Sequence, residues 1–352
     1  MSTFFLNRLT TEPHALAFAG QSTPWPVALA DQTTDPSLDE ALRGHVAAAG
    51  RLLTPVAADL LATTGRPVDL FGFAPNPARL GAAADATASV EGVALTQLGA
   101  LLDLEHLGYS VAQAKPLAVL GHSQGVLAVH MTRAIEAAGS IEAAGTTLDE
   151  ILAVAALIGA AGTRRVRELG LNPKYGEASP MLSVKGATRA QVEALVARVN
   201  NARGPISIAV TNSDNHHVLS GYPEDLAAFA LEAEREHQHQ AKLREQKLHG
   251  GTVFNPTLEY LEVTLPFHSP LMTDAVEQTV AWAGACGFDQ KRTRALAEEV
   301  LLNHVDWNAR VKALFDDADP SKLWIVDLGP GNTLGKLIGN VVQGTGIGVV
   351  EA

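Results

Sequence analysis

One serine lies in a pattern that is typical of a catalytic nucleophile. Residues 121–125 read Gly-His-Ser-Gln-Gly and follow the apolar run 117–120, which predicts a buried strand that turns sharply into a helix. Gly121 and Gly125 allow the backbone to cross closely at such a turn, which lifts the hydroxyl of Ser123 above the sheet edge. The start of the helix offers N–H groups and a positive dipole to an oxyanion. This context predicts that Ser123 is a nucleophile.

A serine nucleophile needs a base, and the best candidate among the 12 histidines is His268. It lies in Leu-Pro-Phe-His-Ser-Pro, where two prolines restrict the backbone directly after an expected strand. His122 adjoins the nucleophile, but we expect its side chain to point away from Ser123. The pairs His216-His217 and His237-x-His239 have diverging side chains, so we expect surface positions and no metal site.

Two architectural units are predicted around these residues. Apolar strands at 15–19, 117–120 and 323–328, with helices at 38–63, 87–107, 126–138 and 148–169, indicate an α/β-hydrolase-like main subdomain built on a parallel sheet. The order βαββαβ follows over 181–184, 189–200, 206–212, 217–220, 224–248 and 258–265, and predicts an inserted ferredoxin-like subdomain. The predicted boundaries are therefore 1–180 with 264–352 for the main subdomain and 181–263 for the small one. His268 falls where the chain returns to the main subdomain, and sites often lie at such junctions.

Charge and cysteine content exclude several classes of protein. The net charge of −12 argues against a nucleic-acid-binding or anionic-membrane-binding surface. The single cysteine, Cys286, has small apolar neighbours and is expected to be a structural thiol in a reducing compartment. Neither a signal peptide nor a membrane span is predicted, so we expect a cytoplasmic protein.

Five motifs together resemble one enzyme family. In chain order they are Phe-Ala-Gly-Gln at 18–21, Gly-His-Ser-Gln-Gly at 121–125, Asn212 with Ser-Gly at 220–221, Pro-Phe-His-Ser at 266–269, and Leu-Gly-Pro-Gly at 328–331. The set resembles the acyl-CoA:acyl-carrier-protein transacylases of fatty acid and polyketide synthesis. Within that family it looks most like the acetyltransferase domain of fungal and actinobacterial type I fatty acid synthases, and a start near residue 1 fits the bacterial multienzyme.

The resemblance implies a role for each residue that matches a family motif. Ser123 would be acylated, and His268 would take its proton and later activate the incoming thiol in a ping-pong exchange. The backbone N–H groups of Gln21 and Gln124 would form the oxyanion hole. In this family a backbone carbonyl orients the histidine, and the matching stretch 303–307 makes the carbonyl of Asp306 our candidate.

The choice of acyl group follows from the charge in the pocket. Malonyl-selective members carry an arginine that binds the malonyl carboxylate, and the matching position here is Ile158. A buried carboxylate without a partner costs several kcal/mol, whereas an acetyl methyl group would pack against isoleucine. This match needs extra residues in an expected loop at 139–147; a shifted register would bring Arg164 or Arg165 to the pocket. Asn212 and Phe267 are further substrate-binding candidates.

The resemblance thus predicts an acetyl-CoA:acyl-carrier-protein transacylase that loads the acetyl starter unit of fatty acid synthesis. Acetyl-CoA would be a substrate and CoA a product, with no permanently bound cofactor. Its partners would be an acyl carrier protein with its phosphopantetheine arm and the other domains of a fatty acid synthase. Malonyl or dual specificity is the alternative within the family. A serine esterase or thioesterase, whose acid would be Asp149, Asp214 or Asp225, and a noncatalytic docking domain are alternatives of other classes.

Positive charge attracts an acidic carrier protein. We therefore expect this acidic chain to concentrate its positive charge near the active site. The candidate clusters are 164–167, which holds three arginines, and 242–247, which holds Lys242, Arg244 and Lys247. Solvated helix faces are the simpler explanation of both clusters. The apolar ending at 349–352 suggests that the chain was cut from a longer polypeptide.

Overall fold

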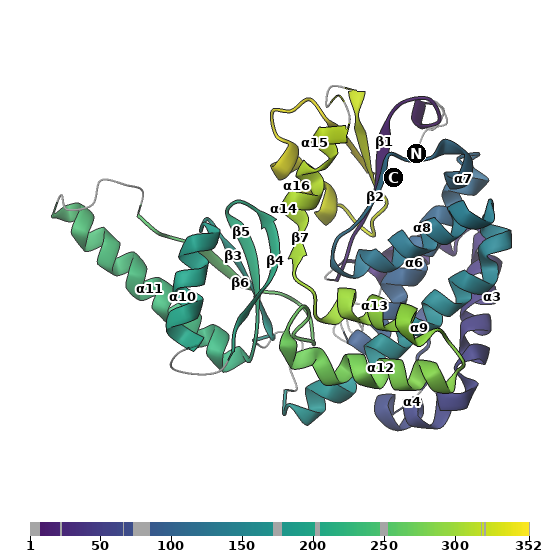
Figure 1. The fold of residues 1–352 in the computed structure, drawn as a ribbon, viewed down its shortest axis with the longest axis horizontal. Helices are drawn as coiled ribbons and strands as arrows, with labels where there is room; N and C mark the ends of the chain where they lie inside the picture. The colour runs from purple at the N-terminus through teal and green to yellow at the C-terminus, as the bar shows by residue number, and fades with distance from the viewer. Residues whose placement is uncertain are drawn as a thin grey trace.

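A computed structural model describes residues 8–21, 23–65, 67–72, 85–171, 178–200, 205–246, 253–317, 319 and 322–351. Two bodies built on separate sheets are visible, a larger one on the right of Figure 1 and a smaller one on the left. The predicted fold class is confirmed, with a parallel α/β main body and a ferredoxin-like small subdomain.

The main sheet has four parallel strands in the order β2-β1-β8-β9. They are β1 (His14–Phe18), β2 (Ala118–Gly121), β8 (Trp324–Asp327) and β9 (Gly348–Glu351). Every residue of β1 is buried, as expected for a central strand covered on both faces. The carboxyl ends of β1, β2 and β8 meet at one edge, since Phe18 pairs with Gly121 and Ala17 with Asp327. The loops that carry three of the five sequence motifs therefore lie together.

Helices cover this sheet and extend the main body. Those before the nucleophile are α2 (Trp25–Gln32), α3 (Pro36–Leu52), α4 (Ala57–Thr64), α6 (Ala86–His106) and α7 (Val111–Ala114). Those after it are α8 (Val126–Ala138), α9 (Ile141–Glu168), α12 (Thr273–Ala285), α13 (Gln290–Leu301), α14 (Trp307–Lys312), α15 (Leu314–Asp317) and α16 (Thr333–Val342). Within the described chain, α9 alone is long and apolar enough to cross a membrane, but it packs against α6, α8 and α12 as a core helix.

The small subdomain folds in the predicted order βαββαβ. Its elements are β3 (Met181–Lys185), α10 (Arg189–Asn200), β4 (Ser207–Ser213), β5 (His216–Ser220), α11 (Pro223–Glu245) and β6 (Thr257–Tyr260). The antiparallel strands β6-β3-β5-β4 bury a separate core that includes Val184, Leu195 and Phe229. A two-residue strand from the main body, β7 (Val305–Asp306), pairs in parallel with β4 and ties the two bodies together.

Three local predictions were wrong. The expected loop at 139–147 is mostly helix, because Ser140 caps the N-terminus of α9 by accepting a hydrogen bond from the N–H of Ala143. The expected helix at 38–63 is interrupted by a 3-10 turn at Thr54–Val56, where Pro55 cannot continue the helical hydrogen bonding. The strand expected at 258–265 ends at Tyr260, after which a tight turn joins the N–H of Val263 to the carbonyl of Leu261.

Candidate active site

Ser123 occupies a strained backbone turn between β2 and α8. Its φ of 52° lies in the left-handed region, which is unfavourable for a residue with a side chain and recurs at functional sites. Gly125 makes the turn possible, since a Cβ at that position would clash with the backbone carbonyl of Phe18. A Cβ on Gly121 would likewise run into the backbone at Val126. The two glycines therefore permit the close strand–helix crossing that the sequence pattern predicts.

A glycine substitution tests this packing. Gly125→Ala is expected to lower the free energy of unfolding by about 1–3 kcal/mol, because the added methyl group meets backbone that cannot move aside cheaply. Gly145→Ala on α9 is the matched control; its Cβ would meet no atom within 4 Å, so helix propensity should make it neutral or slightly stabilising. Urea denaturation measures both. Equal stability of the two variants would contradict the claim that the turn between β2 and α8 has no room for a Cβ at Gly125.

His268 reaches the nucleophile from the loop between β6 and α12. Its Nε2 lies 2.7 Å from the Oγ of Ser123, and its ring is almost completely buried. The backbone of His268 is also in the left-handed region, at φ 56°. Hydrogen bonds of the next residue, Ser269, hold this part of the loop in place. Ser269 donates its N–H to the carbonyl of Leu301 and caps the following 3-10 turn with its side chain. The structure thus brings together the predicted nucleophile and the predicted base.

The orientation of His268 differs from the sequence-based expectation. Its Nδ1 lies 2.8 Å from the carbonyl oxygen of Asn303, so the choice of the Asp306 carbonyl was wrong by three residues. Asp306 instead ends β7 and accepts a hydrogen bond from the N–H of Ala309, which caps α14. A carbonyl can only accept, so Nδ1 carries the proton and Nε2 is left to accept the proton of Ser123.

Burial keeps this histidine neutral. It lowers the pKa of His268 from 6.5 to about 3, although the hydrogen bond to Asn303 favours the protonated form. Neighbouring His122, His304 and Arg310 lower the pKa further. A neutral imidazole is the form that can act as general base toward Ser123.

The low pKa of His268 predicts an unusual pH dependence. The rate of serine acylation per folded protein should stay level from about pH 7.5 to about 5.5, because the base does not protonate near its ordinary value. Since the unfolded chain does bind that proton below about pH 6.5, the free energy of unfolding should fall as the pH drops from about 6.5 toward 3. Stopped-flow acylation with parallel denaturation curves measures both quantities. An acid limb at about pH 6.5 with undiminished stability would contradict the buried, neutral base.

Gln21 and Gln124 follow β1 and β2 and are joined at this edge of the sheet. The Nε2 of Gln21 donates to the Oε1 of Gln124, whose own Nε2 donates to the carbonyl of Val90 on α6. The loops approach closely, since a Cβ on Gly20 would lie 2.8 Å from the Cβ of Ser123. This places Gln21 close to Ser123 and Gln124; the oxyanion role of the two backbone N–H groups stays a prediction.

A cavity of about 1000 Å³ opens at Ser123, between the small sheet and helices α14 and α16. Asn212 and Phe267, both predicted to bind substrate, are among its lining residues. Ile158 is completely buried in the main core and is not among the described residues that line this cavity. Its contact with an acyl group therefore stays a prediction.

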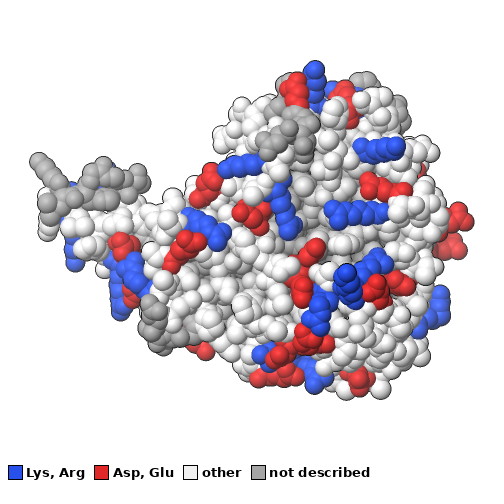
Figure 2. Space-filling view, viewed as in Figure 1, with Lys and Arg blue, Asp and Glu red and all other residues white. Residues whose placement is uncertain are grey.

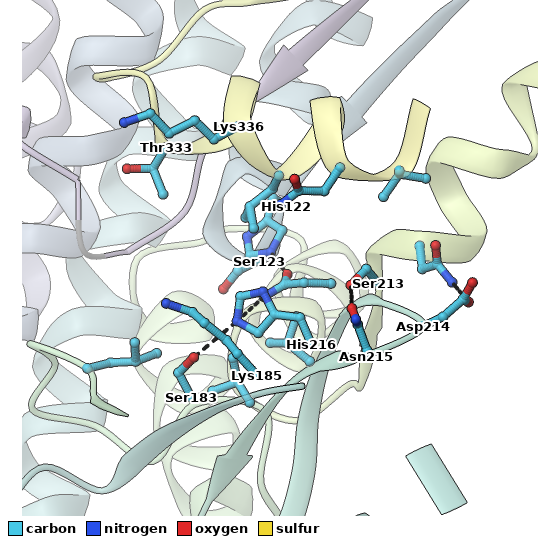
Figure 3. A pocket seen from close by; sticks show the side chains of 18 of the residues that line it. His122, Ser123, Ser183, Lys185, Ser213, Asp214, Asn215, His216, Thr333 and Lys336 are labelled. Carbon is cyan, nitrogen blue, oxygen red and sulfur yellow. Dashed lines mark hydrogen bonds between the residues drawn. The ribbon is translucent and has the colours of Figure 1, made fainter. Parts of the chain in front are cut away.

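A series of polar side chains connects the turn at Ser123 with the small subdomain. The Nε2 of His122 donates to the Oδ1 of Asn212 at 2.8 Å, and the amide of Asn212 lies 3.5 Å from the Nε2 of His216. The hydroxyl of Ser183 lies 3.0 Å from the same nitrogen (Figure 3). Burial lowers the pKa of His216 to about 4, so this ring is also neutral.

Surface positions for His216 and His217 were therefore the wrong expectation. His216 lines the cavity, and His217 is fully buried. The alternation of β5 could have indicated this, since it turns Val218 and Ser220 with His216 to one face and His217 with Leu219 to the other.

The predicted basic clusters lie away from the cavity lining. Arg164 bonds Glu168 and Gln278, and Arg165 bonds the carboxylate of Asp274. Lys242 and Arg244 lie in the last turn of α11, which extends away from the main body in Figure 1, and Lys247 falls outside the described residues. Figure 2 shows basic and acidic side chains interspersed over this face rather than one large basic patch.

Comparisons with known proteins show what this chain resembles. Residues 180–260 match the family model of the fatty acid synthase central AT domain. The fatty acid synthase beta subunit TOXC of Cochliobolus carbonum is 26% identical over 270 residues, which cover 66% of this chain and 12% of that relative. The chain thus spans only a small part of the length of the curated relatives it matches.

Solved structures show the same fold over almost the whole chain. The malonyl CoA-acyl carrier protein transacylase of Coxiella burnetii aligns with a TM-score of 0.64 and 17% identity, covering 96% of this chain and 94% of that one. A type II polyketide synthase acyl-carrier protein in complex with its malonyl-transacylase gives a TM-score of 0.65 and 15% identity, covering 97% and 96%. The chain thus has the fold of these transacylase structures, with Ser123 and His268 in contact beside a cavity. The match at 180–260 and the fatty acid synthase relative together confirm the resemblance to this family.

Proposed function

We propose that this chain is an acetyl-CoA:acyl-carrier-protein transacylase that loads the acetyl starter unit in fatty acid synthesis. The observation that carries the proposal is the hydrogen-bonded series from Ser123 through His268 to the carbonyl of Asn303, with Ser123 on the wall of a cavity. Its partners would be an acyl carrier protein and the other domains of a synthase. No permanently bound cofactor is needed, and a cytoplasmic location stays a prediction.

The reaction takes two similar steps at Ser123. His268 takes the hydroxyl proton while Oγ attacks the thioester carbonyl, and the backbone N–H groups of Gln21 and Gln124 stabilise the oxyanion. CoA leaves as a thiol after receiving the proton from His268. The carrier thiol then gives its proton to His268 and attacks the acyl-serine ester, and Ser123 recovers its proton as the ester bond breaks.

The acetyl preference rests on the residue at the position that the family resemblance assigns to the malonyl-binding arginine. No arginine is among the described lining residues, and Ile158 stands at the position that the family resemblance assigns to the malonyl-binding arginine. A malonyl carboxylate buried beside the nucleophile would lose its hydration without gaining a bidentate partner. Malonyl transfer is the alternative within this class, since the solved structures cited above are described as malonyl-transacylases.

The esterase alternative lacks its acid in the described structure. Asp149 bonds His45, and Asp214 bonds Lys312 and Asn308, while the Nδ1 of His268 is taken by a backbone carbonyl. A transacylase must also hold its acyl group until a thiol arrives.

The lifetime of the acyl-enzyme tests the proposal. Protein acetylated on Ser123 and freed from excess acetyl-CoA should lose its acetyl group at least about 100-fold faster with a pantetheine thiol than in buffer alone, as expected of a positioned thiol acceptor. Mass spectrometry at successive times measures the loss. Equally fast loss without any thiol would support an esterase and contradict the proposal.

A further inference from the structure

Three lysines line the cavity at Ser123, and only one of them lacks a carboxylate partner among the described residues. The Nζ of Lys185 on β3 lies 3.1 Å from Glu259, and the Nζ of Lys312 on α14 lies 3.1 Å from Asp214. Lys336 on α16 has no such ion pair within the described chain. In a chain with a net charge of −12, an uncompensated ammonium on the cavity wall is available to an anionic ligand.

Lys336 has a hydroxyl neighbour on the same wall. Thr333 precedes it by three residues on α16, so both side chains project from one face of the helix, and both line the cavity. Figure 3 shows the two side by side on the α16 wall, with Lys185, Ser183 and His216 on the side of the small subdomain. The candidate site consists of these side chains. The backbone N–H groups at the N-terminus of α16 do not form it, because the N–H of Gly335 already donates to the buried carboxylate of Asp327.

The ligand of the proposed function has matching chemistry. Whether the thiol belongs to CoA or to a carrier protein, it ends a pantetheine arm of two amides whose other end is a phosphate. With the thioester at Ser123, the arm must extend along the cavity that opens there. The neutral His216 and the hydroxyl of Ser183 suit the amides, whereas a phosphate needs a cation and hydroxyl donors.

We propose that Lys336, assisted by Thr333, binds the phosphate of the phosphopantetheine arm. This inference rests on the proposed transacylase function, because it takes the arm from that reaction. The site would serve both half-reactions, since the CoA donor and the carrier acceptor present the same phosphate. It would recognise the arm independently of the acyl group, so it contributes affinity rather than acyl selectivity.

Calorimetric titration with 4′-phosphopantetheine and with pantetheine tests the site without requiring any turnover. The wild-type protein should bind the phosphorylated compound at least about tenfold more tightly, and Lys336→Met should abolish that difference. Lys336→Arg should retain most of it. Lys291→Met is the matched control, because Lys291 is an exposed lysine of α13 outside the cavity lining. Equal binding of the two compounds by the wild type, or an unchanged preference in Lys336→Met, would overturn the proposal.

Kinetics separate this site from the proposed function. Lys336→Met should raise the KM for acetyl-CoA about tenfold, leave the KM for acetyl-pantetheine unchanged and leave kcat nearly unchanged. Equal losses with both thioesters would overturn the phosphate site while the transacylase function stands. If the wild type transfers acetyl from neither thioester, the proposed function fails, and the titration alone then decides whether the phosphate site exists.

Discussion

Replacing Ser123 with alanine is expected to lower the rate of acetyl transfer from acetyl-CoA to a pantetheine thiol by roughly 10⁴-fold or more. The reason is that no covalent intermediate can form, and the 2.7 Å contact with His268 is lost together with its acceptor role. The affinity for CoA should change little, because Oγ is one atom on the wall of a large cavity. Initial rates with labelled acetyl-CoA and a titration with free CoA measure the two effects.

Ser37→Ala is a suitable control for that variant. Ser37 is an exposed serine at the start of α3, where Asp35 provides the helix cap, so both transfer and stability should stay near the wild-type values. A Ser123→Ala protein with undiminished transfer would show that the chain uses another nucleophile. A protein that fails to fold would be recognised by its denaturation curve.

His268→Ala is expected to lower the rates of both acylation and thiol-dependent deacylation by about 10²–10⁴-fold, the usual contribution of a general base. Both steps should fall because the same Nε2 takes the serine proton in the first and the thiol proton in the second. Single-turnover measurements on each half-reaction separate the two effects. The fall in rate should shrink at high pH, where hydroxide takes over part of the deprotonation.

His239→Ala provides the comparison, since His239 is an exposed histidine on α11. It should leave both half-reactions unchanged. If His268→Ala slowed acylation alone, a different group would have to activate the thiol. If it slowed neither step, the buried contact with Ser123 would be structural only.

The contact between Ser123 and His268 could be predicted because each residue has a strong local signal. The Gly-x-Ser-x-Gly pattern predicts a sharp turn between a strand and a helix. The left-handed φ of Ser123 and the close backbone contacts at Gly125 show that turn. The order βαββαβ was equally readable, because the strands and helices of the small subdomain have distinct periodicities.

The group that orients His268 could not be predicted, for a physical reason. A backbone carbonyl has no side-chain signature, so the stretch 303–307 offers five candidates, and only the path of the chain before β7 selects Asn303 over Asp306. The part of the cavity wall that β5 and α16 provide was missed for a similar reason. His216 and Lys336 lie 120 residues apart in the chain, and only the packing of α16 beside the small sheet brings them to one cavity.

The central claim is that Ser123 carries an acetyl group between two thiols. Intact-mass measurement of the protein mixed with equal amounts of acetyl-CoA and malonyl-CoA, followed by peptide mapping, tests it most directly. We expect the mass of one acetyl group on the peptide that contains Ser123, and no added mass on Ser123→Ala. Retention of malonyl in preference to acetyl, or acetylation of the Ser123→Ala protein, would contradict the claim.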